Sequence, residues 1–316
     1  MHYWTFRAFI EDRNGYFDSA YKSFATAQKN SKYICSDKDA EYLRIELYKQ
    51  LSVKLKQSEN TYGDRSCKWT FLIGFPRSGT TLLDTMLSSH PDIEVAEEKS
   101  PMNIVESRIL TTMGKSIDHF NELTPNQISE LRYIYYSSMS KYCDISKRIV
   151  VDKLPLNTIC LPLIKLLFPS SKIIFAVRHP CDTVLSCFQQ VFATNNAMAN
   201  LGSIKTASEF YDAVMSGWMV CSKNLNVDHF ISKYEDLVDD VEASMSAILD
   251  YLDIEWNQNV LRYQQTALER GCINTPSASQ VVQPIYKTSI KKWLSYNEYF
   301  QDSMYLLDKW IDHWGY

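Results

Sequence analysis

The chain has 316 residues, 45% of them hydrophobic and 22% charged, and a net charge of −4 from 33 Lys and Arg against 37 Asp and Glu. These values are typical of a globular protein and exclude general disorder. They also exclude a nucleic-acid partner, because no excess of basic residues is present to neutralise a polyanion.

Residues 1–62 are predicted to form a small helical segment. Small and large residues alternate there in the packing order of the second half of a tetratricopeptide repeat: Gly15, Phe17, Ala20, Phe24 and Ala27. One such unit does not bury its own face. These helices therefore either cap the main domain, or end a longer repeat array and contact a protein through residues 1–60, or form an ordinary amphipathic hairpin.

Residues 66–316 are predicted to form one α/β domain after a linker at 61–64. Short apolar runs are typical of buried parallel strands: Trp69–Ile73, Ile149–Val151, Lys172–Val177 and His229–Ser232. Helical patterns lie between and after them, near 79–88, 125–142, 159–167, 180–190, 207–225, 241–265 and 297–313. This alternation predicts a parallel sheet of the phosphate-loop type with helices on both faces. A long irregular segment at 271–290 suggests a lid.

The first strand runs into the sequence Gly-Phe-Pro-Arg-Ser-Gly-Thr-Thr, residues 74–81, which we call the phosphate loop. A glycine-rich turn that opens a helix presents backbone N–H groups and a helix N-terminus to an anion. A nucleotide triphosphatase would carry lysine where this chain has Thr80, and here the cation is Arg77. The predicted strand at 172–177 also ends in Arg178 rather than in a magnesium-binding aspartate. We therefore expect phosphate binding without a metal.

A second anion site is predicted at Arg178, with Ser186 eight residues later on the following helix. A guanidinium can form a bidentate contact with phosphate, and a hydroxyl adds one donor. Ligands of parallel sheets bind beyond the carboxyl ends of the strands. The two anion sites are thus expected to hold one doubly phosphorylated nucleotide.

At this point the chain resembles the sulfotransferases that use 3′-phosphoadenosine 5′-phosphosulfate, most of all the tyrosylprotein sulfotransferases and bacterial sulfotransferases with tetratricopeptide repeats. The resemblance is carried by GFPRSGTTLLDTMLSSHPDIEVAEE (74–98), VDKLP (151–155), FAVRHPCDTVLS (175–186), ISKYEDLV (231–238) and NTPSASQVVQPIYKTSIKKW (274–293). It implies the sulfotransferase fold and metal-independent, in-line transfer of a sulfuryl group to a hydroxyl of a peptide tyrosine, glycan or small molecule.

The resemblance also implies roles for individual residues. The residues expected to bind the sulfuryl donor, 3′-phosphoadenosine 5′-phosphosulfate, are Arg77, Ser78, Gly79, Thr80, Thr81, Arg178, Ser186, Tyr234, Ser277 and Lys292. Glu98 matches the catalytic base, while Lys153, Ser277 and Arg77 match groups that stabilise charge in the transition state. Glu97 is the rival base, and because successive residues of a strand point to opposite sides, only one of the two glutamates is expected to face the site.

Three positions depart from the pattern of the tyrosylprotein enzymes. Ser100 and Ile104 stand where those enzymes have arginines that hold an acidic peptide, and Gln190 replaces a basic residue near the 3′-phosphate. An acidic tyrosine peptide is therefore not assumed as the acceptor. Two other functions remain open: a phosphate-loop kinase or nucleotide hydrolase of small molecules, and a non-enzymatic repeat protein that binds a partner.

The eight cysteines are scattered and form no Cys-x-x-Cys pair. Such thiols predict reduced core residues in a cytoplasmic protein. Charged residues interrupt any N-terminal signal sequence, and no uncharged stretch reaches the roughly 20 residues that span a bilayer. The histidines show no metal-ligand spacing, and the oligomeric state, a homodimer included, stays open.

Overall fold

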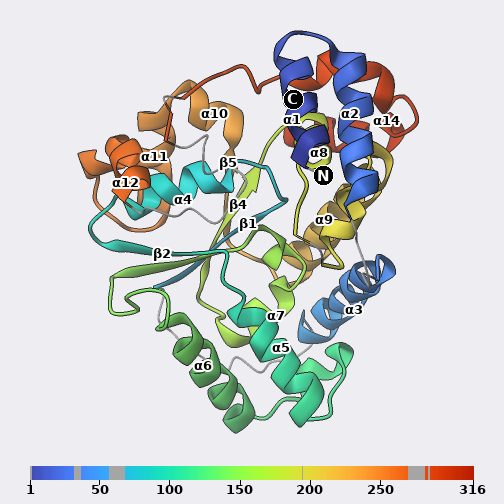
Figure 1. Ribbon diagram of the computed structural model, residues 1–316. Helices are drawn as coiled ribbons and strands as arrows, with labels where there is room; N and C mark the ends of the chain where they lie inside the picture. Colours follow the sequence, from blue (N-terminus) through green and yellow to red (C-terminus); the bar gives the residue numbers. More distant parts are fainter. Residues whose placement is uncertain (1, 32–36, 57–67, 194, 270–281, 284) are drawn as a thin grey trace. The chain divides into compact units, whose positions relative to one another are not determined.

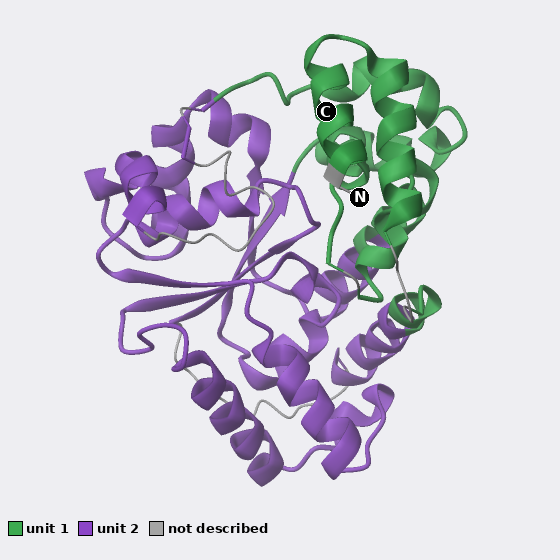
Figure 2. Cartoon of the chain, viewed as in Figure 1, with its two compact units in different colours: residues 1–43, 178–215, 286–316 green, residues 44–177, 216–285 purple. Residues whose placement is uncertain are grey.

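The computed structural model describes residues 2–31, 37–56, 68–193, 195–269, 282–283 and 285–316. The chain divides into two compact units (Figure 2). Unit 1 contains residues 1–43, 178–215 and 286–316, and unit 2 contains residues 44–177 and 216–285. The expected domain boundary at 62–66 falls outside the described residues and stays a prediction.

Unit 2 is built on a five-stranded sheet in the order β2-β3-β1-β4-β5, in which all four pairs of neighbouring strands are parallel. The strands are β1 (Trp69–Gly74), β2 (Ile93–Glu97), β3 (Ile149–Lys153), β4 (Lys172–Val177) and β5 (His229–Lys233). The predicted parallel α/β fold is therefore confirmed. Residues 69–74 are buried on both faces, which explains their continuous apolar run.

Helices cover both faces of this sheet (Figure 1). One face carries α4 (Thr80–Ser88), α10 (Tyr234–Asp239), α11 (Val241–Tyr251) and α12 (Tyr263–Glu269). The other carries α5 (Pro101–Thr112), α6 (Pro125–Met139) and α7 (Leu161–Leu167). Short 3-10 turns join some of these elements: η1 (Ile117–Glu122), η2 (Pro155–Thr158) and η4 (Gln258–Arg262).

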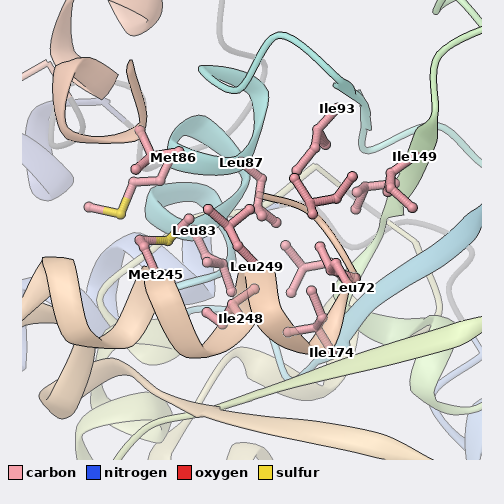
Figure 3. Packing of buried hydrophobic residues seen from close by; sticks show 14 of the residues in the cluster. Leu72, Leu83, Met86, Leu87, Ile93, Ile149, Ile174, Met245, Ile248 and Leu249 are labelled. Carbon is pink, nitrogen blue, oxygen red and sulfur yellow. The ribbon is translucent and has the colours of Figure 1, made fainter. Parts of the chain in front are cut away.

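Alternate residues of the strands pack on opposite faces, as the two-residue period of a strand requires. On the α4 face, Leu72 joins Leu83, Met245 and Ile174 in a buried aliphatic cluster (Figure 3). On the other face, Trp69 packs edge-on against Tyr135 of α6, with ring centroids 5.2 Å apart. The two cores fix which residues at the strand ends face which helices.

Two predicted helices are interrupted. The helical pattern at 241–265 is divided into α11, η4 and α12, and the last pattern is divided into η5 (Lys292–Phe300) and α14 (Met304–Trp314). In the first case Asp253 has φ +58°, a left-handed conformation that ends the helix. Across the described residues, no helix is both long and apolar enough to span a membrane.

Unit 1 contains the helical hairpin of α1 (His2–Arg13) and α2 (Phe17–Asn30), joined at Gly15 with φ +79°. Its other helices are α8 (Pro180–Phe188), η3 (Met198–Leu201), η5, α14 and the first part of α9 (Ile204–Asn224); α3 (Asp39–Lys56) begins here and continues in unit 2. Ala20, Phe24 and Ala27 are buried, as their small and large spacing suggested. Whether this hairpin belongs to a repeat array stays a prediction.

Asp152 of β3 is a carboxyl group with no exposed surface, and Tyr135 donates a hydrogen bond of 2.8 Å to its Oδ2. Burial raises the pKa of Asp152 to about 7, and the Tyr135 hydrogen bond opposes that rise. Between about pH 4 and pH 7 the folded protein therefore holds a proton that the unfolded chain has released. Folding stability must fall as the pH rises through this window.

Between pH 5 and pH 8 we expect the free energy of unfolding of the wild type to fall by about 2–3 kcal/mol because Asp152 loses its proton. Asp152→Asn should not show this fall, because the amide does not titrate. Urea unfolding at a series of pH values measures it. Tyr135→Phe is the control, since it keeps the titrating group and removes only the bond that favours the charged form. Parallel pH profiles for wild type and Asp152→Asn would contradict the assignment.

Candidate functional site

The phosphate loop leaves β1 at Gly74 and enters α4 at Thr80. At Gly74, with φ +156°, an added Cβ would lie 2.4 Å from the carbonyl oxygen of Ala176 on β4. Only glycine fits this close approach of two backbones. The carbonyl of Gly74 also accepts a hydrogen bond of 2.8 Å from the hydroxyl of Thr158. The close approach to Ala176 and the hydrogen bond from Thr158 thus both hold the backbone where the loop leaves the sheet.

The loop places its cation and hydroxyls at the N-terminus of α4. Arg77 has φ +70° and is half-buried. Ser78 is 3% exposed, and its hydroxyl donates to the carbonyl of Phe75 at 2.7 Å. Thr80 and Thr81 are buried in the first turn of α4. The N–H groups of such a turn, together with the adjacent guanidinium, suit a phosphate or sulfate group.

Tyr234, the residue after β5, packs its ring against the phosphate loop. Gly79, with φ +92°, lies so close to the Tyr234 ring that an added Cβ would be 2.6 Å from Cδ2. Tyr234 therefore lies beside the phosphate loop, and its contact with a nucleotide stays a prediction. An aromatic ring at this place can contact the nucleoside part of a nucleotide whose phosphate is held by the loop.

Lys153, the last residue of β3, is fully buried among three carboxylates. Its Nζ lies 3.1 Å from Asp84 Oδ2, 3.1 Å from Glu98 Oε1 and 3.6 Å from Glu97 Oε1. Burial by itself would lower the pKa of Lys153, but Asp84, Glu98 and Glu97 together raise it above its usual value. The ammonium therefore stays charged at neutral pH although no part of it is exposed.

Both carboxylates approach Lys153, and that only one of the two glutamates faces the reaction site stays a prediction. Glu97 pairs with Lys153 across the sheet and points to the α4 face by strand alternation. Glu98 has φ +49°, which breaks the alternation, while its N–H still donates to the Lys153 carbonyl at 2.8 Å. Its side chain is 32% exposed against 13% for Glu97, so Glu98 is the more accessible of the two.

A cavity of about 540 Å³ opens beside Glu98. Its walls come from the turn after β2, from α5, from the end of α6 and from the loop that follows: Glu98, Lys99, Ser100, Asn103, Ile104, Ser107, Ser138 and Tyr142. The volume lies in the range of small-molecule sites. One carboxylate therefore contacts a buried ammonium and also lines a space that can hold a second molecule.

Unit 1 holds the predicted second anion site. Arg178 is 8% exposed, and its Nη2 donates to the carbonyl of Ser289 at 2.7 Å. Ser186 is half-buried on α8, which begins at Pro180 as expected. Asp182 of α8 accepts hydrogen bonds from two backbone N–H groups of the C-terminal segment, those of Lys291 at 2.7 Å and Trp293 at 2.8 Å.

Lys292, another predicted donor-binding residue, bonds through Nζ to Asp12 Oδ2 of α1 at 2.5 Å. Ser277 lies outside the described residues, as does most of the predicted lid. The structure thus brings Arg77, Ser78, Gly79, Thr80, Thr81, Glu98, Lys153 and Tyr234 into unit 2. Arg178, Ser186 and Lys292 belong to unit 1, and that the two anion sites share one ligand stays a prediction.

Comparison with known proteins decides the family. The model described as "Sulfotransferase family" matches residues 70–258, which include the phosphate loop, Glu98, Lys153 and Arg178. The chain belongs to the sulfotransferase family. Among solved structures, the chain is similar to the sulfotransferase domain of the Synechococcus PCC 7002 olefin synthase, with a TM-score of 0.53 and 19% identity over 80% of this chain and 98% of that one. That likeness concerns the fold.

Three curated relatives with similar sequences are longer than this chain. It is 28% identical over 78% of its length to an uncharacterized protein of Aquifex aeolicus, and 26% identical over 73% and 75% to protein-tyrosine sulfotransferases of Drosophila melanogaster and Caenorhabditis elegans. The chain spans 33%, 48% and 64% of those three proteins.

Sequence reasoning missed Asp84, the first partner of the Lys153 ammonium. Asp84 is fully buried in α4, beside the buried apolar residues Leu83, Met86 and Leu87. A charged residue on a buried helix needs a partner, and that was the available signal. The cavity residues Asn103 and Ser107 were missed as well, because helix α5 was not predicted. Tyr142 lies at the end of the predicted helix 125–142, but nothing in the sequence marked it as a site residue.

We expect Asp84→Asn to lower the free energy of unfolding of the protein by about 3 kcal/mol, near the low end for a broken buried ion pair, because Glu97 and Glu98 still face the ammonium. Glu97→Gln is the matched control, and it should cost clearly less because Glu97 lies farther from Nζ and is partly exposed. Denaturant unfolding of both variants measures the difference. Equal losses would show that Asp84 is not the principal partner.

Proposed function

We infer that this protein transfers a sulfuryl group from 3′-phosphoadenosine 5′-phosphosulfate to an acceptor hydroxyl, with Glu98 as the base. The observation that carries this inference is the position of the Glu98 carboxylate, 3.1 Å from a buried ammonium and at the wall of a 540 Å³ cavity. Membership of the sulfotransferase family and the protein-tyrosine sulfotransferase relatives support it.

The residues of the phosphate loop fit the 5′ end of that donor. Backbone N–H groups at the start of α4, with Arg77 beside them, would hold the phosphosulfate. Gly79 leaves no room for a side chain beside Tyr234, so the backbone can approach the ligand closely. The donor supplies an activated sulfuryl group whose bond to the phosphate oxygen breaks during transfer.

Glu98 then takes the proton of the acceptor hydroxyl as that oxygen forms its bond to sulfur. Lys153 holds the Glu98 carboxylate in place and presents a fixed positive charge where negative charge develops on the transferred group. The two groups lie 3.1 Å apart, so the ammonium can orient the carboxylate through a direct ion pair. Ser277 is proposed, from the resemblance alone, to add a hydrogen bond to the same group.

The 3′-phosphate is proposed to bind at Arg178 and Ser186. Arg178 is buried and held by the Ser289 carbonyl, so its guanidinium is fixed in direction. His179 beside it stacks on Trp293, and burial, with Arg178 and Lys291 nearby, lowers its pKa to about 4. His179 is therefore neutral at physiological pH and does not supply charge to a phosphate.

A kinase or nucleotide hydrolase is not favoured, because Thr80 occupies the lysine position of such loops. A role for residues 1–60 in contacting a protein, a cytoplasmic location and a homodimer all stay predictions from the sequence.

We expect Glu98→Gln to keep its affinity for 3′-phosphoadenosine 5′-phosphate and to lose about 10²–10⁴-fold in turnover, the usual contribution of a general base. Calorimetry measures the binding, and transfer of labelled sulfate measures the turnover. Glu97→Gln is the control, with a much smaller loss expected. If Glu97→Gln is the more damaging change, the base is assigned to the wrong glutamate.

For Arg178→Ala we expect a loss of about 10- to 100-fold in affinity for 3′-phosphoadenosine 5′-phosphate, the size of one charge-assisted hydrogen bond. Affinity for adenosine 5′-phosphate should change little, so the ratio of the two affinities shrinks. The affinity of Arg178→Lys, which keeps the charge, should lie between those of the wild type and Arg178→Ala. A ratio equal to that of wild type would remove Arg178 from the 3′-phosphate site.

A further inference from the structure

The cavity beside Glu98 also indicates which kind of acceptor the protein takes, an inference that rests on the proposed sulfuryl transfer. Of its eight lining residues, one is the carboxylate proposed as the base and one is an ammonium. Five others are neutral groups that form hydrogen bonds: the hydroxyls of Ser100, Ser107, Ser138 and Tyr142 and the amide of Asn103. Such a wall offers donors and acceptors to a polar molecule without requiring a charge on it.

Lys99, the one cation of this wall, already has an aromatic partner. Its Nζ lies 4.9 Å from the centroid of the Tyr142 ring, which is a cation–π contact. An anionic acceptor would therefore meet a single ammonium that is partly satisfied, and it would lie beside the negative carboxylate of Glu98.

Two arginines, Arg108 of α5 and Arg44 of α3, form ion pairs with glutamates. Arg108 donates from Nη2 to Glu130 at 2.7 Å and from Nη1 to Thr112 at 3.0 Å. Arg44 is paired with the buried Glu106 of α5, with Nη2 and Oε2 2.5 Å apart. Acidic peptides are best recognised by arginines that present two N–H groups to a carboxylate. The lining of the cavity contains no arginine.

We propose that the acceptor is an uncharged, hydroxyl-rich molecule, namely a neutral carbohydrate, bound between the turn Glu98–Ser100 and the exposed face of α5. Asn103 and Ser107 lie one helical turn apart on that face and point to the same cavity. Several hydroxyls of one sugar can then bond to the wall while another lies at Glu98. That hydroxyl loses its proton to Glu98 and gains the sulfuryl group, and the 3′,5′-bisphosphate of adenosine leaves.

The test uses the full chain with labelled 3′-phosphoadenosine 5′-phosphosulfate and three acceptor sets at equal concentration: neutral oligosaccharides, tyrosine peptides rich in Asp and Glu, and simple phenols. We expect transfer to at least one neutral oligosaccharide to exceed transfer to the acidic peptides about tenfold or more. Saturation-transfer NMR in the presence of 3′-phosphoadenosine 5′-phosphate should detect saccharide binding directly, independently of turnover.

Variants locate the binding site. Asn103→Ala and Ser107→Ala should each raise the KM for the saccharide about 3- to 10-fold, the size of one neutral hydrogen bond, and leave affinity for 3′-phosphoadenosine 5′-phosphate unchanged. Thr111→Ala is the matched control, because Thr111 is an exposed residue of the same helix outside the cavity. Ser100→Arg combined with Ile104→Arg adds two cations to the wall and should increase transfer to the acidic peptides while reducing transfer to the saccharide.

Preferred transfer to acidic peptides or phenols, or the absence of saccharide binding in the NMR experiment, would overturn the carbohydrate assignment and leave sulfuryl transfer intact. A saccharide KM that rises equally in Thr111→Ala would also overturn it. Failure to bind 3′-phosphoadenosine 5′-phosphate at all, by contrast, would overturn the proposed function itself.

Discussion

The site depends on one buried charge, the ammonium of Lys153 at the end of β3. An isolated ammonium in a protein interior is strongly unfavourable, so its presence there requires carboxylates close by. Those carboxylates come from two other elements, Asp84 from α4 and the glutamate pair from the end of β2. Since α4 is also the helix that opens at the phosphate loop, the ion cluster ties the anion-binding element to the strand that carries the base.

The backbone conformation of Glu98 links the buried ion cluster to the cavity. In an extended conformation Glu98 would turn away from Lys153, toward the α5 and α6 side of the sheet. The positive φ instead lets the carboxylate reach Nζ while the residue still borders the cavity on that side. A strained conformation in a non-glycine residue is unfavourable, and such residues gather at functional sites. Here the strained backbone allows the Glu98 side chain both to contact the buried Lys153 ammonium and to line the cavity.

Much of the framework was predictable because the relevant signals are local. The apolar runs predicted four of the five strands, all except β2, the glycine spacing predicted the phosphate loop, and the motifs identified Glu98 and Lys153. The features that were not predicted from the sequence depend on tertiary packing. Alternation did not predict that both glutamates approach Lys153, because a positive φ in glutamate has no sequence signal. Asp84 was missed because its partner lies on a strand far along the chain from α4. The partition of the chain into two interleaved units was equally out of reach, since contacts between distant segments define it.

The attachment of the C-terminal segment in unit 1 has a bearing on how this region can evolve. Asp182 holds the segment through the main-chain N–H groups of Lys291 and Trp293 rather than through their side chains. Those hydrogen bonds persist whichever amino acids other than proline occupy the two positions. Natural sequence drift there can alter whatever those side chains touch without releasing the segment, whereas a single exchange at Asp182 would undo both connections at once.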